Sequence, residues 1–467
     1  MNPITLPFFY DYVFPNLILP NGSPPEFGII NYINTMYSNK FRNETLFEFP
    51  HEAFKATPMS IIFGNHLGVM PSSLRMGGSY LGRPCFSHIV NIQENSVYFG
   101  KKQTDRYIYP MKITLHFDRF TGFDRIGDKQ NGEFFWKHIS DEVLKDVRAR
   151  KAFIFLDWAN ENFIEKREFE ELHLALKRSG ILKEQIILSI NSFNAQEIYE
   201  SWFSPEERCI EVRNLPFLLA NISWFFAVNT HTRISDQEFQ ISKNVLREHH
   251  FLFPNRRARP HRLAMIMKMA SDGILNQGDW SLLNDTTLDH GFHEALQIFS
   301  INKDNVKIQF PHNLKDEPGK SFSSDSGWDP RTTYKPYLDS YFYIASETFV
   351  QGEYKSLTEK IFKPIANFQP FLFIAFPGAL AELKKLGFKT FHPYIDESYD
   401  LENDYKKRML LIYNEVQRLC NMPKEELHNW YWSMEDILVH NRNHLFEIYK
   451  SETHSVKFVE HLASKLK

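Results

Sequence analysis

The sequence of 467 residues predicts an α/β protein with two Rossmann-like domains. Short continuous apolar runs, such as residues 152–156, suit strands of a parallel sheet that is covered on both faces. These runs alternate with segments of helical periodicity, which is the pattern of strand–helix–strand units. The chain is also longer than one hydrophobic core usually serves. We therefore expect two domains, residues 1–240 and residues 241–467.

The N-terminal half carries the alternation in its second part, while the first 110 residues are less regular. Those first residues mix Pro, Gly and Asn turns with short strands such as 96–99, and we expect them to elaborate the first domain. The later part reads as strand, helix, strand, helix, strand over residues 152–156, 165–177, 185–190, 195–203 and 209–212, with Gly180 ending the first helix.

The C-terminal half resumes the alternation near residue 249. A strand over 250–254 precedes a helix that begins at Pro260 and stops at Gly273. Further along the chain we expect a strand ending in Ser-Glu-Thr at 346–348, a long loop over 316–335, a helix from Thr358, a buried strand over 371–374, and helices over 403–419, 424–440 and 443–467.

Basic side chains crowd the turn between the first strand and the first helix of this half. They are Arg256, Arg257, Arg259, His261 and Arg262. Guanidiniums at the positive end of a helix repel one another and the helix dipole, and a bound anion relieves that repulsion. Arginine also binds phosphate oxygens in a bidentate manner. The competing interpretation is a basic surface loop or a nucleic-acid contact, but the compact cluster at a strand–helix junction favours phosphate.

A second candidate segment is Thr358-Glu359-Lys360, at the start of a helix. A lysine in the first turn is unfavourable for the helix itself, so Lys360 indicates an anionic ligand. Glu359 is suited to accept hydrogen bonds from sugar hydroxyls, and a nucleotide sugar has both a pyrophosphate and a ribose. In the alternative interpretation, Thr358 is an ordinary N-cap, Glu359 a first-turn acid and Lys360 a solvated surface residue.

In their order and spacing, the arginine turn, the Ser-Glu-Thr strand end and Thr-Glu-Lys resemble the donor-binding half of the α1,3-fucosyltransferases and related two-domain glycosyltransferases. The segment 387–391, Gly-Phe-Lys-Thr-Phe, followed by 396–400, Asp-Glu-Ser-Tyr-Asp, also resembles uncharacterised glycosyltransferase-like proteins, many of them from phages and bacteria. The resemblance implies a GT-B-type architecture, in which C-terminal helices cross back to the first domain. It implies that Arg262 and Lys360 bind the pyrophosphate, that Glu359 holds the ribose, and that Glu347 lies near the donor. Arg256, Arg259, His261 and Thr358 complete the expected donor site. Residues 375–378, Ala-Phe-Pro-Gly, replace the family's glycine-rich turn, so the donor's identity is left open.

A catalytic base is expected from the N-terminal half. Inverting glycosyl transfer needs a carboxylate or histidine within hydrogen-bond reach of the acceptor hydroxyl. Asp157 and Glu161 follow the carboxyl end of a predicted strand, where sites of α/β proteins form, and His66 is a further candidate. The alternative interpretation is that Asp157 or Asn160 caps the following helix.

Composition and charge limit the remaining possibilities. The net charge of −3 gives no overall attraction to nucleic acid or to an anionic membrane. The three cysteines are far apart and match no zinc or disulfide pattern, and no metal-binding spacing is evident. The N-terminus has no signal-peptide pattern, and the apolar runs at 215–228 and 371–380 are too short to span a bilayer. We therefore expect a cytoplasmic, metal-independent protein with no cofactor and no transmembrane segment.

The sequence thus predicts a hexosyl- or fucosyltransferase-like enzyme that moves a sugar from a nucleotide-activated donor to an acceptor hydroxyl. Two other functions fit the same motifs. One is a non-catalytic nucleotide- or glycan-binding protein, and the other is a nucleic-acid-associated protein that uses the turn from Arg256 to Arg262. Nucleotide sugar and a glycan or other hydroxyl acceptor are the expected partners, and nucleic acid is not.

Overall fold

The computed structural model describes most of the chain from residue 141 onward and a few short segments before it. The described ranges are 6–9, 69–71, 96–99, 106–113, 141–158 and 164–467, without 216, 229, 283–287, 303, 305, 307, 311, 313, 315–332 and 452. The chain divides into two compact units. Unit 1 is Met1–Phe217 with Glu452–Lys467, and unit 2 is Leu218–Ser451.

The units divide at 217/218, whereas the sequence predicted a boundary at 240/241. The residues between these positions pack on unit 2. The ring of Phe239 stacks on that of Phe368 at 3.9 Å between centroids, and the N–H of Ile234 donates to Oδ1 of Asn367 at 3.1 Å. These contacts join distant segments, which explains why no local sequence signal marks the division.

Unit 1 contains a mainly parallel sheet with strand order β3-β1-β4-β5-β6-β7, and β2 pairs with β4 in the antiparallel sense. All pairings along the main order are parallel. The strands are β1 (Leu6–Phe9), β2 (Val69–Pro71), β3 (Ser96–Phe99), β4 (Tyr107–Ile113), β5 (Ala152–Trp158), β6 (Ile186–Ile190) and β7 (Glu211–Asn214). The predicted parallel alternation is therefore confirmed, although β7 begins two residues later than expected.

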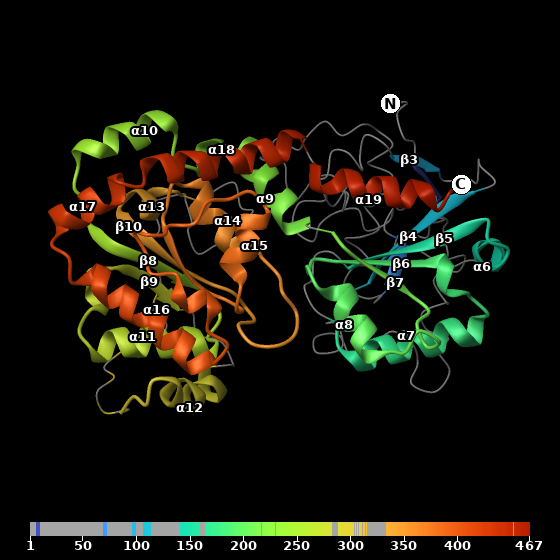
Figure 1. The fold of residues 1–467 in the computed structure, drawn as a ribbon, viewed down its shortest axis with the longest axis horizontal. Helices are drawn as coiled ribbons and strands as arrows, with labels where there is room; N and C mark the ends of the chain where they lie inside the picture. The colour runs from blue at the N-terminus through green and yellow to red at the C-terminus, as the bar shows by residue number, and fades with distance from the viewer. Residues whose placement is uncertain are drawn as a thin grey trace, which may run out of the picture. The chain divides into compact units, whose positions relative to one another are not determined.

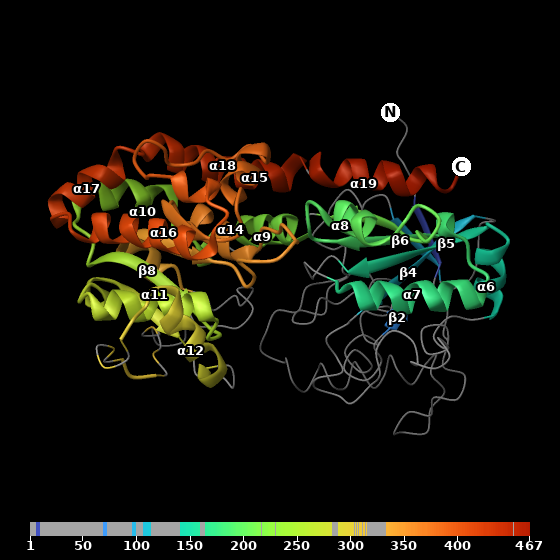
Figure 2. The same ribbon diagram turned by 60° about the horizontal axis from the view of Figure 1, so that its bottom comes forward.

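Helices cover both faces of this sheet, with α7 on one side and α19 on the other (Figures 1 and 2). The helices of unit 1 are α6 (Asp141–Arg148), α7 (Lys166–Ser179), α8 (Ala195–Trp202) and α19 (Thr453–Ser464). Helix α7 ends at Gly180, whose φ of 65° is the left-handed conformation that favours glycine. The helix-stop prediction at Gly180 is confirmed.

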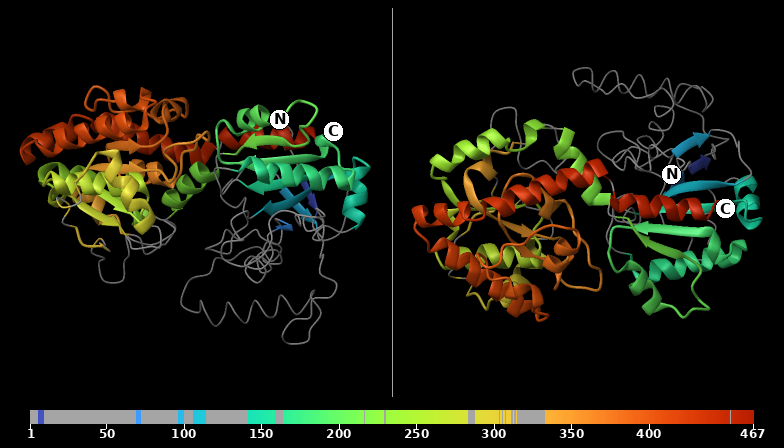
Figure 3. Two further views of the ribbon diagram at one scale, coloured as in Figure 1. Left: turned by 90° about the horizontal axis from the view of Figure 1, so that it is seen from below. Right: turned by 45° about the horizontal axis from the view of Figure 1, so that its top comes forward.

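The last helix of the chain, α19, belongs to unit 1 and lies alongside its strands (Figure 3). The ring of Phe458 lies 5.5 Å from that of Phe155 on β5, centroid to centroid. Glu211 on β7 accepts from Lys465 and contacts His461, each at 2.7 Å. The expected return of the C-terminal helices to the first unit is thus confirmed.

Unit 2 contains a four-stranded parallel sheet in the order β11-β10-β8-β9. Its strands are β8 (His249–Asn255), β9 (Asp279–Leu282), β10 (Ser340–Ser346) and β11 (Phe371–Ile374). The chain first adds β9 on one side of β8, and then adds β10 and β11 on the other side. The direction of winding therefore reverses between β8 and β10. In open α/β sheets, ligands bind outside the carboxyl ends of the strands at such a reversal.

The helices of unit 2 are α9 (Phe217–Val228), α10 (Asp236–Ile241), α11 (Pro260–Ser271), α12 (Leu288–Ile298), α13 (Lys335–Leu338), α14 (Glu359–Ala366), α15 (Ala379–Lys385), α16 (Tyr405–Cys420), α17 (Lys424–Trp432) and α18 (Glu435–Ser451). Figures 1 and 2 show α11 and α12 on one side of the sheet and α14 and α18 on the other. No helix among the described residues is both long enough and apolar enough to cross a membrane.

The C-terminal helices break at different places from those predicted. We expected helices over 424–440 and 443–467, but α17 ends at Trp432 and α18 runs through to Ser451. The hydroxyl of Ser433 donates back to the carbonyl of Trp430 at 2.6 Å, and the N–H of Ile437 already bonds the carbonyl of Met434. These local hydrogen bonds end one helix and begin the next without any glycine or proline signal.

Candidate functional site

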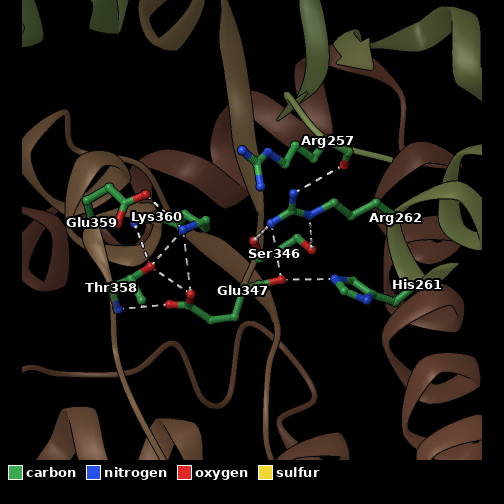
Figure 4. Close-up of polar contacts among 8 residues, drawn as sticks. All are labelled: Arg257, His261, Arg262, Ser346, Glu347, Thr358, Glu359 and Lys360. Atoms are coloured by element: carbon green, nitrogen blue, oxygen red, sulfur yellow. Dashed lines mark hydrogen bonds and ion pairs between the residues drawn. The ribbon is translucent and has the colours of Figure 1, made fainter. Parts of the chain in front are cut away.

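The sequence-predicted donor residues converge at the reversal of unit 2. Strand β8 ends at Asn255, the arginine turn follows, and α11 begins at Pro260. Strand β10 ends at Ser346, with Glu347 directly after it. Because β8 and β10 are parallel neighbours, the arginine turn and Glu347 lie at the same edge of the sheet. Figure 4 shows their side chains together with Thr358, Glu359 and Lys360 from the start of α14.

Arg262 is buried and binds the end of β10 and the arginine turn. Its Nη2 donates to the carbonyls of Ser346 and Glu347 at 2.9 and 3.2 Å, and its Nε donates to the Ser346 hydroxyl at 3.3 Å. Its Nη1 donates to the carbonyl of Arg257 at 3.3 Å. Of the five N–H groups of a guanidinium, one on Nη1 is left for a ligand. Burial lowers the pKa of Arg262 to about 10, so the side chain still carries its charge at neutral pH.

His261 makes a similar contact beside it. Its Nε2 lies 2.9 Å from the carbonyl oxygen of Glu347, so the neutral ring donates a hydrogen bond there. Burial, together with the nearby charge of Arg262, lowers the pKa of His261 to about 3. This histidine is therefore a neutral support for the strand end in the structure.

Glu347 connects the end of β10 to the start of α14. Its carboxylate accepts from the N–H of Thr358 at 2.9 Å and from the Thr358 hydroxyl at 2.6 Å. The Nζ of Lys360 lies 3.9 Å from the same carboxylate, and only 2% of the Glu347 side chain is exposed. Burial raises the pKa of Glu347, against the opposing charge of Lys360. The carboxylate thus fixes where the first turn of α14 begins.

Thr358, Glu359 and Lys360 form one hydrogen-bonded group. Thr358 is the N-cap of α14, and its hydroxyl oxygen accepts from the Nζ of Lys360 at 3.1 Å. The same ammonium donates to Glu359 at 2.8 Å, with 25% of the Lys360 side chain and 23% of the Glu359 side chain exposed. Burial pushes the pKa of Glu359 upward, but Lys360 and Lys363 outweigh it and hold that pKa at about 2.

This arrangement contains features of both sequence interpretations. Thr358 is the N-cap that the alternative interpretation expected, and Lys360 has Glu359 as a counter-ion within the protein. Lys360 is nevertheless placed over the strand end rather than away from it, as Figure 4 shows. The ligand roles of Lys360 and Glu359 stay predictions.

Arg257 is the residue to which the sequence assigned no separate role. It is exposed, and within the described residues its guanidinium has no hydrogen-bond acceptor and no ion-pair partner. In Figure 4 its side chain runs beside that of Arg262, with no dashed line from its guanidinium. Arg256 is also exposed, whereas the guanidinium of Arg259 lies 5.7 Å from the centre of the Phe349 ring. The sequence signal for Arg257 was its place in the arginine turn, but the resemblance gave the pyrophosphate role to Arg262.

The predicted catalytic residues are described only in part. Asp157 is the next-to-last residue of β5, paired in register with Lys112 on β4 and Ser189 on β6. The sequence placed Asp157 after the end of this strand, whereas the structure extends β5 to Trp158 and so includes Asp157 in it. Glu161 and His66 lie outside the described residues. The choice of base therefore stays a prediction.

The chain matches no protein-family model, and no curated protein matches it. Among solved structures, it is similar to a DNA-modifying β-glucosyltransferase solved with and without its substrate uridine diphosphoglucose, with 9% identity over 82% of this chain and 92% of that one, and a TM-score of 0.40. It is also similar to the T4 phage BGT in complex with UDP-glucose, at 11% identity, 82% and 92% coverage and a TM-score of 0.35. An α,α-trehalose 6-phosphate synthase from Burkholderia multivorans gives 11% identity, 76% and 80% coverage and a TM-score of 0.36. At such low identity, the side chains of this chain decide what its site does.

Proposed function

We propose that unit 2 binds the diphosphate of a nucleotide-activated sugar at the reversal between β8 and β10, and that the protein is a glycosyltransferase. The observation that carries the proposal is the exposed guanidinium of Arg257, which has no partner among the described residues and lies beside the buried charge of Arg262. An arginine in this position gains little from the fold, since neighbouring like charges and the positive end of α11 both oppose it. A bound phosphate removes that cost and matches the planar guanidinium.

The rest of the site supports the same ligand. Helix α11 begins with Pro260, which has no N–H, so the N–H groups of His261 and Arg262 are the ones in its first turn that lack a partner within the helix. Lys360 adds an ammonium, on a side chain that is a quarter exposed, and Arg262 adds one N–H and a buried positive charge. Glu359 stays ionised at any physiological pH because its pKa is held at about 2, so it can accept hydrogen bonds from ribose hydroxyls.

In the proposed reaction, the bond between the anomeric carbon and the diphosphate breaks, and a bond from that carbon to the acceptor oxygen forms. The bonding electrons leave with the diphosphate, whose negative charge grows in the transition state. Arg257, Arg262 and Lys360 stabilise that charge, which is the role of preorganised cations in catalysis. The acceptor proton passes to a base in unit 1, for which Asp157, Glu161 and His66 are the candidates.

A ligand screen on the full chain tests the proposal. Nucleoside diphosphates and nucleotide sugars should raise the midpoint of thermal unfolding, and nucleotide sugars should be consumed when an acceptor or water is present. Binding without consumption of any nucleotide sugar would favour the non-catalytic binding protein. Stabilisation by oligonucleotides but by no nucleoside diphosphate would favour the nucleic-acid function and would overturn the proposal.

A further inference from the structure

An aromatic ring is exposed next to the proposed anion site. Phe349 is 41% exposed and is the one aromatic residue among the exposed large apolar side chains in the described part of the chain. It follows Glu347 by two residues, in the segment that leaves the carboxyl end of β10. A single exposed apolar side chain is common on protein surfaces. What sets Phe349 apart is its place two residues after Glu347 and its contact with Arg259.

The ring is held by the same helix start that positions the anion site. Arg259 is the N-cap residue of α11 and Arg262 lies in its first turn, so both belong to the start of this helix. Arg262 donates to the backbone of Ser346 and Glu347, and the guanidinium of Arg259 lies 5.7 Å from the centre of the Phe349 ring. The two arginines thus contact successive parts of one segment. A cation and an aromatic ring at this distance attract each other, which gives the ring a preferred orientation.

We propose that the Phe349 ring is the surface on which the base of the bound nucleotide stacks. This inference rests on the proposed function and deepens it. It names a nucleoside diphosphate as the recognised part of the donor, rather than a bare diphosphate, a sugar 1-phosphate or a lipid diphosphate. A nucleotide carries an anionic part and a flat aromatic part. The site offers Arg257 and Arg262 for the first, and Phe349, next to Arg259, for the second. Stacking is tolerant of base identity because every base has a π-face, so Phe349 selects nucleotides as a class.

Calorimetric titration of the full chain with UDP, GDP and inorganic pyrophosphate tests this assignment. For Phe349→Ala, we expect the affinity for UDP or GDP to fall by about 5- to 100-fold, the range that loss of an aromatic–base stack produces. The affinity for pyrophosphate should stay within about twofold of wild type, because pyrophosphate has no base to stack. Phe349→Trp should keep nucleotide affinity. Leu401→Ala removes a side chain that is 80% exposed in the same unit and should change neither affinity.

Two results would overturn the role of Phe349. One is an unchanged nucleotide affinity in Phe349→Ala, and the other is an equal loss for nucleotide and pyrophosphate, which would show that the ring only supports Arg259. Ligand binding by the wild-type protein distinguishes a failure of the stacking role from a failure of the proposed function. If wild type binds pyrophosphate but binds nucleotides no more tightly, only the stacking role fails. If wild type binds neither, the anion site itself fails. Equal thermal unfolding midpoints for wild type and variants establish that folding is intact.

Discussion

The carboxylate of Glu347 accepts two hydrogen bonds from Thr358, one from its backbone N–H at 2.9 Å and one from its hydroxyl at 2.6 Å. These bonds tie the end of a central strand to the first residue before α14. They also place the Nζ of Lys360 within 3.9 Å of Glu347. The pair therefore sets the position of a cation that we expect to meet the donor.

Replacing Thr358 should weaken this connection and the whole of unit 2. Thr358→Ala removes a helix cap, which costs about 1 kcal/mol, and leaves the buried Glu347 carboxylate one donor short, which costs about 1–3 kcal/mol more. Denaturant unfolding should show the loss, while Thr358→Ser, which keeps the hydroxyl, should lie within about 1 kcal/mol of wild type. Equal stability for Thr358→Ala and wild type would contradict the role of the hydroxyl.

His261 should make stability fall in acid. The unfolded chain binds a proton at this histidine below about pH 6.5, whereas the folded chain, with a pKa of about 3, does not. Between these values the unfolded state binds more protons, so the free energy of unfolding should decrease as pH falls, by up to about 1.4 kcal/mol per pH unit. His261→Gln keeps a side-chain donor for the carbonyl of Glu347 and should lose this slope. Unfolding curves of wild type and His261→Gln at pH 6, 5 and 4 measure this slope. The same dependence of the free energy of unfolding on pH in both proteins would contradict the role of His261.

Arg257 should matter for ligand affinity and little for folding. Arg257→Ala should weaken nucleoside diphosphate binding by about 10- to 100-fold, since a charged hydrogen bond contributes about 1.5–3 kcal/mol. Lys385→Ala is a matched control, because Lys385 is an exposed cation of the same unit paired with Glu382. Calorimetry on both variants decides the matter. An equal, small effect of the two substitutions would mean that only general surface charge acts.

Substitutions of Glu359 and Lys360 should show whether the start of α14 binds the donor or is an ordinary helix start. Glu359→Gln should lower stability at neutral pH by about 1–3 kcal/mol, because a pKa held below its unfolded value contributes stability above that value, and this deficit should shrink as pH falls toward 2. If Glu359 also holds the ribose, nucleoside diphosphate affinity falls while pyrophosphate affinity does not. A stability loss with intact nucleotide affinity would make Glu359 only a first-turn acid. Lys360→Ala should weaken both ligands.

The sequence predicted β8, α11 and α14 of unit 2 well because the ends of these helices carry local signals. Pro260 at the start of α11, Gly273 after its end and Thr358 at the cap of α14 each have a backbone reason to be there. The direction of the Arg262 side chain had no such signal. Its acceptors, Ser346 and Glu347, lie 84 and 85 residues away along the chain and become neighbours only when β8 pairs with β10. For the same reason the exposed guanidinium of Arg257 could not be distinguished from the buried one of Arg262.

Substitutions of the proposed base should lower turnover without changing the affinity for the donor nucleotide. An inverting transferase needs a base for the acceptor proton, and a base acts in the transition state rather than on the bound donor. The double substitution Asp157→Asn, Glu161→Gln should therefore lower turnover by about 10²- to 10⁴-fold while nucleoside diphosphate affinity stays at the wild-type value. Arg257→Ala and Lys360→Ala should instead weaken nucleoside diphosphate binding. Turnover is measured by release of the nucleoside diphosphate from a consumed nucleotide sugar. Wild-type turnover in the double variant would remove both carboxylates from the mechanism. His66, or a retaining reaction that uses no such base, would then be the explanation to test.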